Sequence, residues 1–141
     1  MKTTNWFYKL LPSALNVLLT FGLSLPFLFM FGRGLAWKIS WIVIFFLYNC
    51  IFEFFYEKRD PGMILFNTYY ERKRSLPQEL LYVLLYTLSF STLLFYIWIP
   101  GDLLIINLFL VQLPFVLIAK NTLHGFLSGN IKTTRGYKIY R

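Results

Sequence analysis

The chain has 141 residues, of which 57% are hydrophobic, 21% are aromatic and only 14% are charged. Soluble domains average about 25% charged residues, and the shortfall here comes from long uncharged runs. A soluble domain of this length cannot bury so much apolar surface, so the composition predicts an integral membrane protein. The net charge of +8 does not indicate a nucleic-acid partner. The basic residues lie in short segments between apolar runs, where we expect anionic lipid headgroups as their partners.

The apolar runs predict an all-α polytopic membrane helical bundle of about four transmembrane helices. The first run has 22 residues, which at about 1.5 Å per residue would cross a hydrocarbon core. It is longer than the roughly 7–15 residues of a signal-peptide core, so we expect a retained helix. The last run is short and contains Asn107, Gln112 and Pro114, which makes it the weakest span. The expected helices cover about residues 10–31, 39–56, 80–99 and 103–119.

The sequence predicts a single domain over residues 1–141, with short turns after the first and third helices and a long loop between the second and third. Pro100, Gly101 and Asp102 predict a tight hairpin turn between the third and fourth helices. The run at about 61–71 is apolar and aromatic but too short to span, so we expect a short amphipathic segment in the membrane interface. Residues 120–141 are expected to form a basic cytoplasmic tail.

Lysine and arginine are distributed unevenly between the two sides of the predicted bundle. With four spans, only Arg33 and Lys38 fall on one side. An excess of Lys and Arg marks the cytoplasmic side, so the sequence predicts a multi-pass protein of the cell (inner or plasma) membrane with both termini in the cytoplasm. The residues on the cytoplasmic side are Lys2, Lys9, Lys58, Arg59, Arg72, Lys73, Arg74, Lys120, Lys132, Arg135, Lys138 and Arg141.

No enzyme signature is present in the sequence. It has no glycine-rich phosphate loop, no His-Glu-x-x-His pattern and no nucleophile elbow. Cys50 is the only cysteine and His124 the only histidine, so neither a disulfide nor a metal site is expected. We therefore expect no catalytic residues, no cofactor and no metal.

Glu53 is the sharpest single feature, because it lies near the cytoplasmic end of the second predicted helix. A carboxylate there is costly unless it reaches headgroups, pairs with a cation or binds a proton. One interpretation is a proton-linked or cation-linked carboxylate in a transport path. The other, which we favour, is a structural ion pair with Lys9 or Arg59 as the partner.

Four neutral polar side chains also fall within the predicted spans. They could line a hydrophilic cleft, but amide groups also join helices to one another at about 1 kcal/mol per contact. Packing between helices is the favoured interpretation. The four are Asn16, Asn49, Asn107 and Gln112.

Three segments, taken together, resemble motifs of the RDD family of small membrane proteins. Residues 9–16 read Lys-Leu-Leu-Pro-Ser-Ala-Leu-Asn, against a family pattern of Arg-Leu-Leu-Ala-x-x-x-Asp. Residues 52–68 begin Phe-Glu and continue through a polar turn containing Pro61 and Gly62. Residues 123–129 read Leu-His-Gly-Phe-Leu-Ser-Gly, against Leu-His-Asp-x-x-x-Gly. Order and spacing match from Lys9 to about Arg135.

The resemblance implies a four-helix membrane domain with structured elements on the cytoplasmic face. Those elements would include Asp60, Pro61, Gly62 and His124. The residues that name the family, Arg, Asp and Asp, fall on Lys9, Asn16 and Gly125. Sodium/proton exchange and general transport have been proposed for some members of the family.

Two functions from different classes follow. The first is a non-catalytic binding or scaffolding subunit that packs against a larger membrane protein, or against further copies of itself. The second is an RDD-type transporter or cation/proton antiporter, in which Glu53 acts with Asn16 and Lys9. The replacement of both family Asp residues favours the first.

Overall fold

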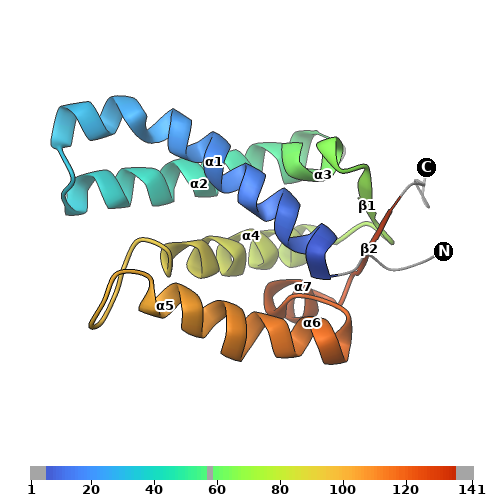
Figure 1. The fold of residues 1–141 in the computed structure, drawn as a ribbon. Helices are drawn as coiled ribbons and strands as arrows, with labels where there is room; N and C mark the ends of the chain where they lie inside the picture. The colour runs from blue at the N-terminus through green and yellow to red at the C-terminus, as the bar shows by residue number, and fades with distance from the viewer. Residues whose placement is uncertain (1–5, 57–58, 136–141) are drawn as a thin grey trace.

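The structure, a computed structural model, describes residues 6–56 and 59–135. Helices α1 (Trp6–Phe31) and α2 (Leu35–Phe55) form an antiparallel hairpin, and α4 (Leu76–Ser91) packs beside α2 (Figure 1). A last helical column returns alongside α4; it consists of α5 (Asp102–Ile105), the π-helix η1 (Ile106–Gln112) and α6 (Leu113–Ala119). The remaining elements gather at one end of the bundle: α3 (Pro61–Leu65), β1 (Thr68–Tyr70), α7 (Leu123–Leu127) and β2 (Thr133–Arg135).

A row of hydrogen bonds joins α1 to α2. Three polar side chains of α1, spaced four residues apart on one face, are fully buried, and each accepts a bond from an aromatic side chain of α2. Such bonds hold helices together where no water is available. The pairs are Tyr48 Oη to Asn16 Oδ1 at 3.0 Å, Trp41 Nε1 to Thr20 Oγ1 at 3.2 Å and Trp37 Nε1 to Ser24 Oγ at 3.2 Å.

The aromatic core lies between α2 and α4. The ring of Phe45 stacks on Phe90 with centroids 4.0 Å apart, and Tyr86 meets Phe45 edge-on at 5.1 Å. Trp41 meets Phe90 edge-on at 5.4 Å. Aromatic pairs of this kind add about 0.5–1.5 kcal/mol beyond their buried area, so the core fixes the position of α4 against the hairpin.

The third helix differs at both ends from the range expected at 80–99. It begins at Leu76, because Ser75 and Gln78 form a reciprocal capping box and a proline is tolerated in the first turn. It ends at Ser91, and the next residue, Thr92, bonds its hydroxyl to the Ser89 carbonyl at 2.7 Å. The backbone amides of residues 97–99 donate to the Asp102 carboxylate and do not take part in helical hydrogen bonds.

Among the described residues, three helices are long and apolar enough to cross a membrane. They cover Lys9–Phe31, Leu35–Phe55 and Asp102–Ala119. The last run, expected to be the weakest span, therefore qualifies, whereas α4 with its 16 residues does not. The first, second and fourth helices expected from the sequence are confirmed, with α1 and α2 each beginning four residues earlier than predicted.

The polar residues of the last run belong to a π-helix that the sequence did not predict. In η1 the Asn107 amide donates to Ser89 Oγ of α4 at 2.7 Å. Gln112 donates to Asn107 Oδ1 at 3.3 Å and accepts the Leu123 amide at 3.0 Å. These two side chains thus join the last column to α4 and α7, as the packing interpretation expected.

The segment at 61–71 and the tail fold together, which the all-α prediction missed. Strand β1 pairs with β2 in antiparallel register, Tyr69 opposite Thr134. Gly62 and Met63 of α3 are buried, whereas Ile64 and Leu65 are exposed. Part of the expected basic tail is therefore structured, and residues 136–141 lie outside the described residues.

Gly62 provides a test of how α3 is seated. A Cβ at Gly62 would overlap the backbone of Pro12 in α1, so Gly62→Ala should lower the unfolding free energy in detergent by about 1–3 kcal/mol. Gly22 of α1 has open space where its Cβ would be. Gly22→Ala is the control and should not destabilise the protein, because alanine is favoured over glycine inside a helix. Equal stability of the two variants would contradict this seating.

Candidate functional site

A buried ion pair joins α2 to the segment after β1. Tyr70 Oη donates to Glu53 Oε1 at 2.6 Å, and Arg74 Nη1 lies 3.7 Å from Glu53 Oε2. Glu53 is 0% exposed, and Tyr70 and Arg74 are nearly as buried. The cation partner is therefore Arg74, and the expectation of Lys9 or Arg59 was wrong.

Two aromatic rings hold the Arg74 guanidinium beside the carboxylate. Its Cζ lies 4.0 Å from the ring centroid of Tyr70 and 4.0 Å from that of Tyr82. Such contacts stabilise a desolvated cation by about 2 kcal/mol or more. The guanidinium is thus placed by β1 on one side and by α4 on the other.

Pairing of the two strands positions Tyr70. Tyr70 lies opposite Thr133 of β2, and the next amide, that of Glu71, donates to the Lys132 carbonyl at 2.9 Å. The side chain of Arg72 donates to the Gly129 carbonyl at 2.9 Å. The C-terminal segment therefore holds the partners of Glu53 in place. We call residues 60–74 and 121–135 together the cap.

Two polar side chains seat α3: Asn16 of α1 and Asp60, which immediately precedes α3. Asp60 caps α3 by accepting the Met63 amide at 2.7 Å, and Asn16 Oδ1 accepts the Gly62 amide at 3.1 Å. Burial raises the pKa of the Asp60 carboxyl, although the bond from Met63 opposes that shift. Pro61 occupies the first turn of α3, where the missing amide proton costs no helical hydrogen bond. These predicted positions do lie together.

His124 of α7 packs inside the cap against α4. Its ring stacks on Tyr86 with centroids 4.9 Å apart and meets Tyr82 edge-on at 5.0 Å. Burial, together with the nearby charges of Arg74 and Lys9, lowers the pKa of His124 to about 3. The imidazole is therefore a neutral packing group at physiological pH.

The remaining predicted residues do not join Glu53. The Lys9 ammonium donates to the backbone carbonyl of Lys120, which ties α1 to the end of α6. Asn49 is buried, and its amide donates to the Phe45 carbonyl one turn earlier at 2.8 Å. Arg59 lies over the ring of Tyr69, 4.1 Å from its centroid. The amide nitrogen of Asn49 thus bonds within its own helix.

Two cavities border the cap. The first, of about 50 Å³, lies between α1, α4 and the cap, and Lys9, Asp60, Arg74 and His124 are among its lining residues. It has room for a few water molecules but is far below the roughly 300–1,000 Å³ of ligand pockets. The second, of about 200 Å³, lies between α4 and η1. Among the described residues, no group of three or more His, Cys, Asp or Glu side chains is placed to hold a metal.

Sequence reasoning missed Tyr70, Arg74 and Tyr48. Tyr70 and Arg74 belong to a strand and a loop, so no helical spacing relates them to Glu53. Tyr48 and Asn16 are 32 residues apart in the sequence and meet only because α1 and α2 fold back on each other. The available signal was the row of polar residues at four-residue spacing in α1, which indicates a buried helix face.

Comparison of the chain with protein-family models, with curated proteins and with solved structures finds no match.

The Glu53–Arg74 pair can be tested by a double-mutant cycle in detergent. Removing one partner of a buried pair leaves an uncompensated charge and costs about 3–5 kcal/mol, so Arg74→Met should destabilise strongly. The double variant Glu53→Gln/Arg74→Met should lose less than the sum of the single losses, by at least about 1 kcal/mol. Glu71→Gln, outside this pair, is the control. Strict additivity would show that the two groups do not interact.

Acid denaturation tests the placement of His124. Its pKa is about 3 in the folded protein against an ordinary value of 6.5, so the unfolded chain binds more protons between these values. Stability should therefore fall as the pH is lowered from 6.5, by up to about 1.4 kcal/mol per pH unit from this group. His124→Phe keeps the ring stacking and should flatten that slope. A melting temperature that depends on pH equally in both proteins would contradict the burial of a neutral imidazole.

Proposed function

We propose that this chain is a non-catalytic, multi-pass membrane protein that serves as a binding or scaffolding subunit of a larger membrane complex. The observation that carries the proposal is the engagement of Glu53. Both of its carboxylate oxygens are directed to fixed partners in the cap. A carboxylate held in this way supports a structural role, because carrying an ion would require it to exchange partners.

Membrane placement of four spans is part of the proposal. Three helices have the required length and hydropathy, and α4, lying alongside them between the same two ends (Figure 1), would be the fourth. Its 16 residues reach about 24 Å at 1.5 Å per residue, so the bilayer or the connecting loop would accommodate the difference.

The cap is proposed to face the cytoplasm. Arg72 and Lys73 are basic residues of the cap and Arg59 adjoins it, whereas Arg33 and Lys38 lie at or next to the turn between α1 and α2. The positive-inside rule favours this orientation in the cell membrane, with the cap near anionic headgroups. Lys2, Lys58, Lys138 and Arg141, which also entered the sequence argument, lie outside the described residues.

Membership of the RDD family is also a proposal. It is supported by the meeting of the resembling segments around one small cavity, whose lining includes Lys9, Asp60 and His124. Asn16 contacts the same segment through Gly62. Gly125 stands at a family Asp position, and a Cβ there would overlap the side chain of Asn121. Asn121 in turn donates to the Ile131 carbonyl at 3.0 Å, so this chain uses that space to hold the cap.

The sides of the bundle and the cap offer surfaces for a partner. Large apolar side chains such as Phe29, Phe55 and Ile118 are more than four-fifths exposed along the helices. In a membrane these faces would contact lipid, a larger membrane protein or a second copy of the chain. The basic surface of the cap would add contacts outside the bilayer.

Purification and flux measurements together test the proposal. The protein, extracted in mild detergent, should be recovered in fixed stoichiometry with one larger membrane component or with itself. Liposomes that contain this chain alone should carry no proton-coupled cation flux. Flux that Glu53→Gln abolishes while Glu71→Gln leaves it intact would contradict the subunit proposal and favour the antiporter alternative.

A further inference from the structure

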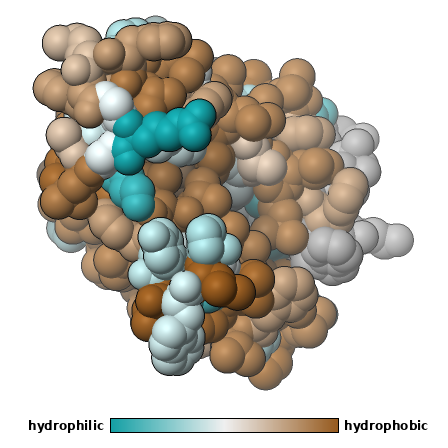
Figure 2. Space-filling view, turned by 60° about the vertical axis from the view of Figure 1, so that its left-hand side comes forward, coloured by the Kyte–Doolittle hydropathy of each residue, from teal (hydrophilic) through white to brown (hydrophobic). Residues whose placement is uncertain are grey.

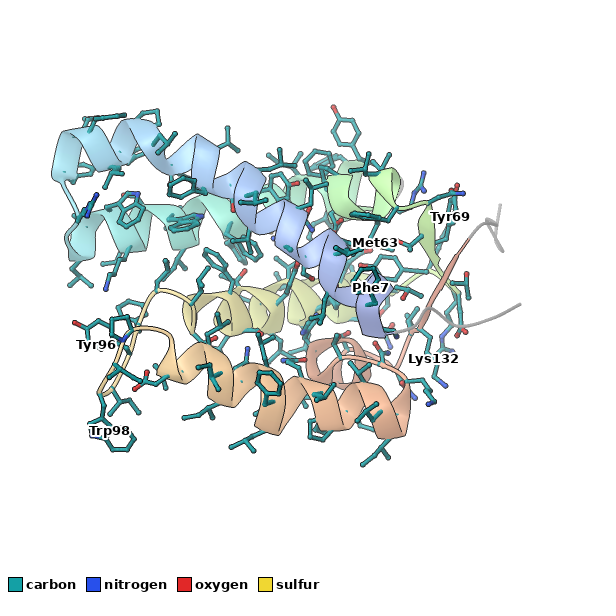
Figure 3. All side chains as sticks on the ribbon, in the orientation of Figure 1. Phe7, Met63, Tyr69, Tyr96, Trp98 and Lys132 are labelled. Carbon is teal, nitrogen blue, oxygen red and sulfur yellow. The ribbon has the colours of Figure 1, made fainter. Side chains whose placement is uncertain are left out.

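We propose that the loop after α4 is a membrane-interface anchor that inserts the tip residues Tyr96, Ile97, Trp98 and Ile99 into the lipid at the end of the bundle opposite the cap. The occupant of this surface is therefore a phospholipid monolayer. The inference rests on the membrane placement proposed above. Figure 3 shows Tyr96 and Trp98 at that end, far from Met63, Tyr69 and Lys132.

The tip of this loop is apolar and exposed. Trp98 is 80% exposed, and Tyr96, Ile97 and Ile99 are each more than half exposed. Scattered apolar residues on a surface need no explanation, but a contiguous group of four is a mark of contact with lipid or protein. The face of the molecule turned toward this end is mainly hydrophobic (Figure 2).

The base of the loop is fixed to the bundle. Leu94 is buried in the core formed by α2 and α4, and Phe95 packs against the same core. The loop therefore leaves the bundle from a packed base.

The carboxylate of Asp102 accepts hydrogen bonds from the backbone amides of the tip. It bonds the amides of Ile97, Trp98 and Ile99 at 2.7–3.3 Å, and the Leu103 amide at 2.7 Å. In water these amides would be satisfied by solvent. In lipid each unsatisfied amide would be costly, and irregular backbone is tolerated only where the protein supplies the partners. One carboxylate that serves four amides is thus suited to a loop placed in the membrane interface.

Cationic and aromatic groups beside the tip fit a phospholipid. The Lys38 ammonium lies 5.4 Å from the ring centroid of Phe95 and 5.6 Å from that of Tyr96. This places a positive charge next to the apolar tip. The ammonium could then bind a lipid phosphate while the tip contacts the acyl chains. Tryptophan and tyrosine are the side chains enriched at this depth of a bilayer.

Spin-label accessibility tests the inference on the full chain in vesicles of phosphatidylcholine and phosphatidylglycerol. In a Cys50→Ala background, a nitroxide is attached at Ile97→Cys, so that Trp98 stays native. Oxygen concentrates in lipid and a neutral nickel chelate concentrates in water. The matched positions are Leu47→Cys, exposed near the middle of α2, and Arg72→Cys, exposed on the cap.

The label at position 97 should show an oxygen-to-nickel accessibility ratio several-fold above that at position 72 and below that at position 47. A ratio at 97 equal to that at 72, with 47 still in lipid, would overturn the anchor alone. Protection of 97 from both reagents would identify a protein partner and also overturn it. A water-like ratio at 47 would overturn the membrane placement itself.

Asp102→Asn supplies a second arm, because the amide keeps one acceptor oxygen of two. The label at 97 should then become more mobile and several-fold more accessible to nickel, while the label at 47 keeps its ratio and reports that the bundle is intact. No change at 97 would contradict the role of Asp102. A change at 47 as large as that at 97 would contradict a local role of this residue.

Discussion

The carboxylate of Glu53 is the point on which the cap and the bundle depend. It is completely buried at the end of α2, and its two oxygens face Tyr70 and Arg74, which the pairing of β1 with β2 brings to it. A buried charge of this kind requires a partner at close range, because removing one ion from water costs several kcal/mol. The constraint thus reaches from α2 through β1 to the C-terminal strand.

The same requirement explains the aromatic residues around the site. Arg74 lies between the rings of Tyr70 and Tyr82, and Tyr82 also contacts His124. The cation is therefore surrounded by groups that stabilise it without water. Toward the other end, the bonds of Thr20 and Ser24 to tryptophans of α2 meet the need for polar partners in an apolar bundle. The chain uses its few polar side chains mainly to join its own elements.

Part of this arrangement could be predicted from the sequence. Hydropathy located the helices that begin near Leu10, Ile39 and Leu103, because long apolar runs leave few alternatives. The end of the third helix could not be predicted, since the run to Ile99 remains apolar and only the bonds to Asp102 show that it turns. The π-helix at Asn107 and the pairing of β1 with β2 depend on tertiary contacts, which hydropathy does not contain.

At the site, the sequence identified Glu53 as a carboxylate that requires a partner but selected the wrong cation. Lys9 and Arg59 were the candidates, whereas Arg74 reaches Glu53 only through the fold of residues 60–74. The sequence did not group Asn16 with Asp60, Pro61 and Gly62, but the fold brings it to them, because its side chain accepts the Gly62 amide. Amide hydrogen exchange would test most directly whether Glu53 holds the cap on the bundle. Glu53→Ala should accelerate exchange in β1, β2 and α7 and leave the turn between α1 and α2 unchanged; unchanged exchange in the cap would contradict the account.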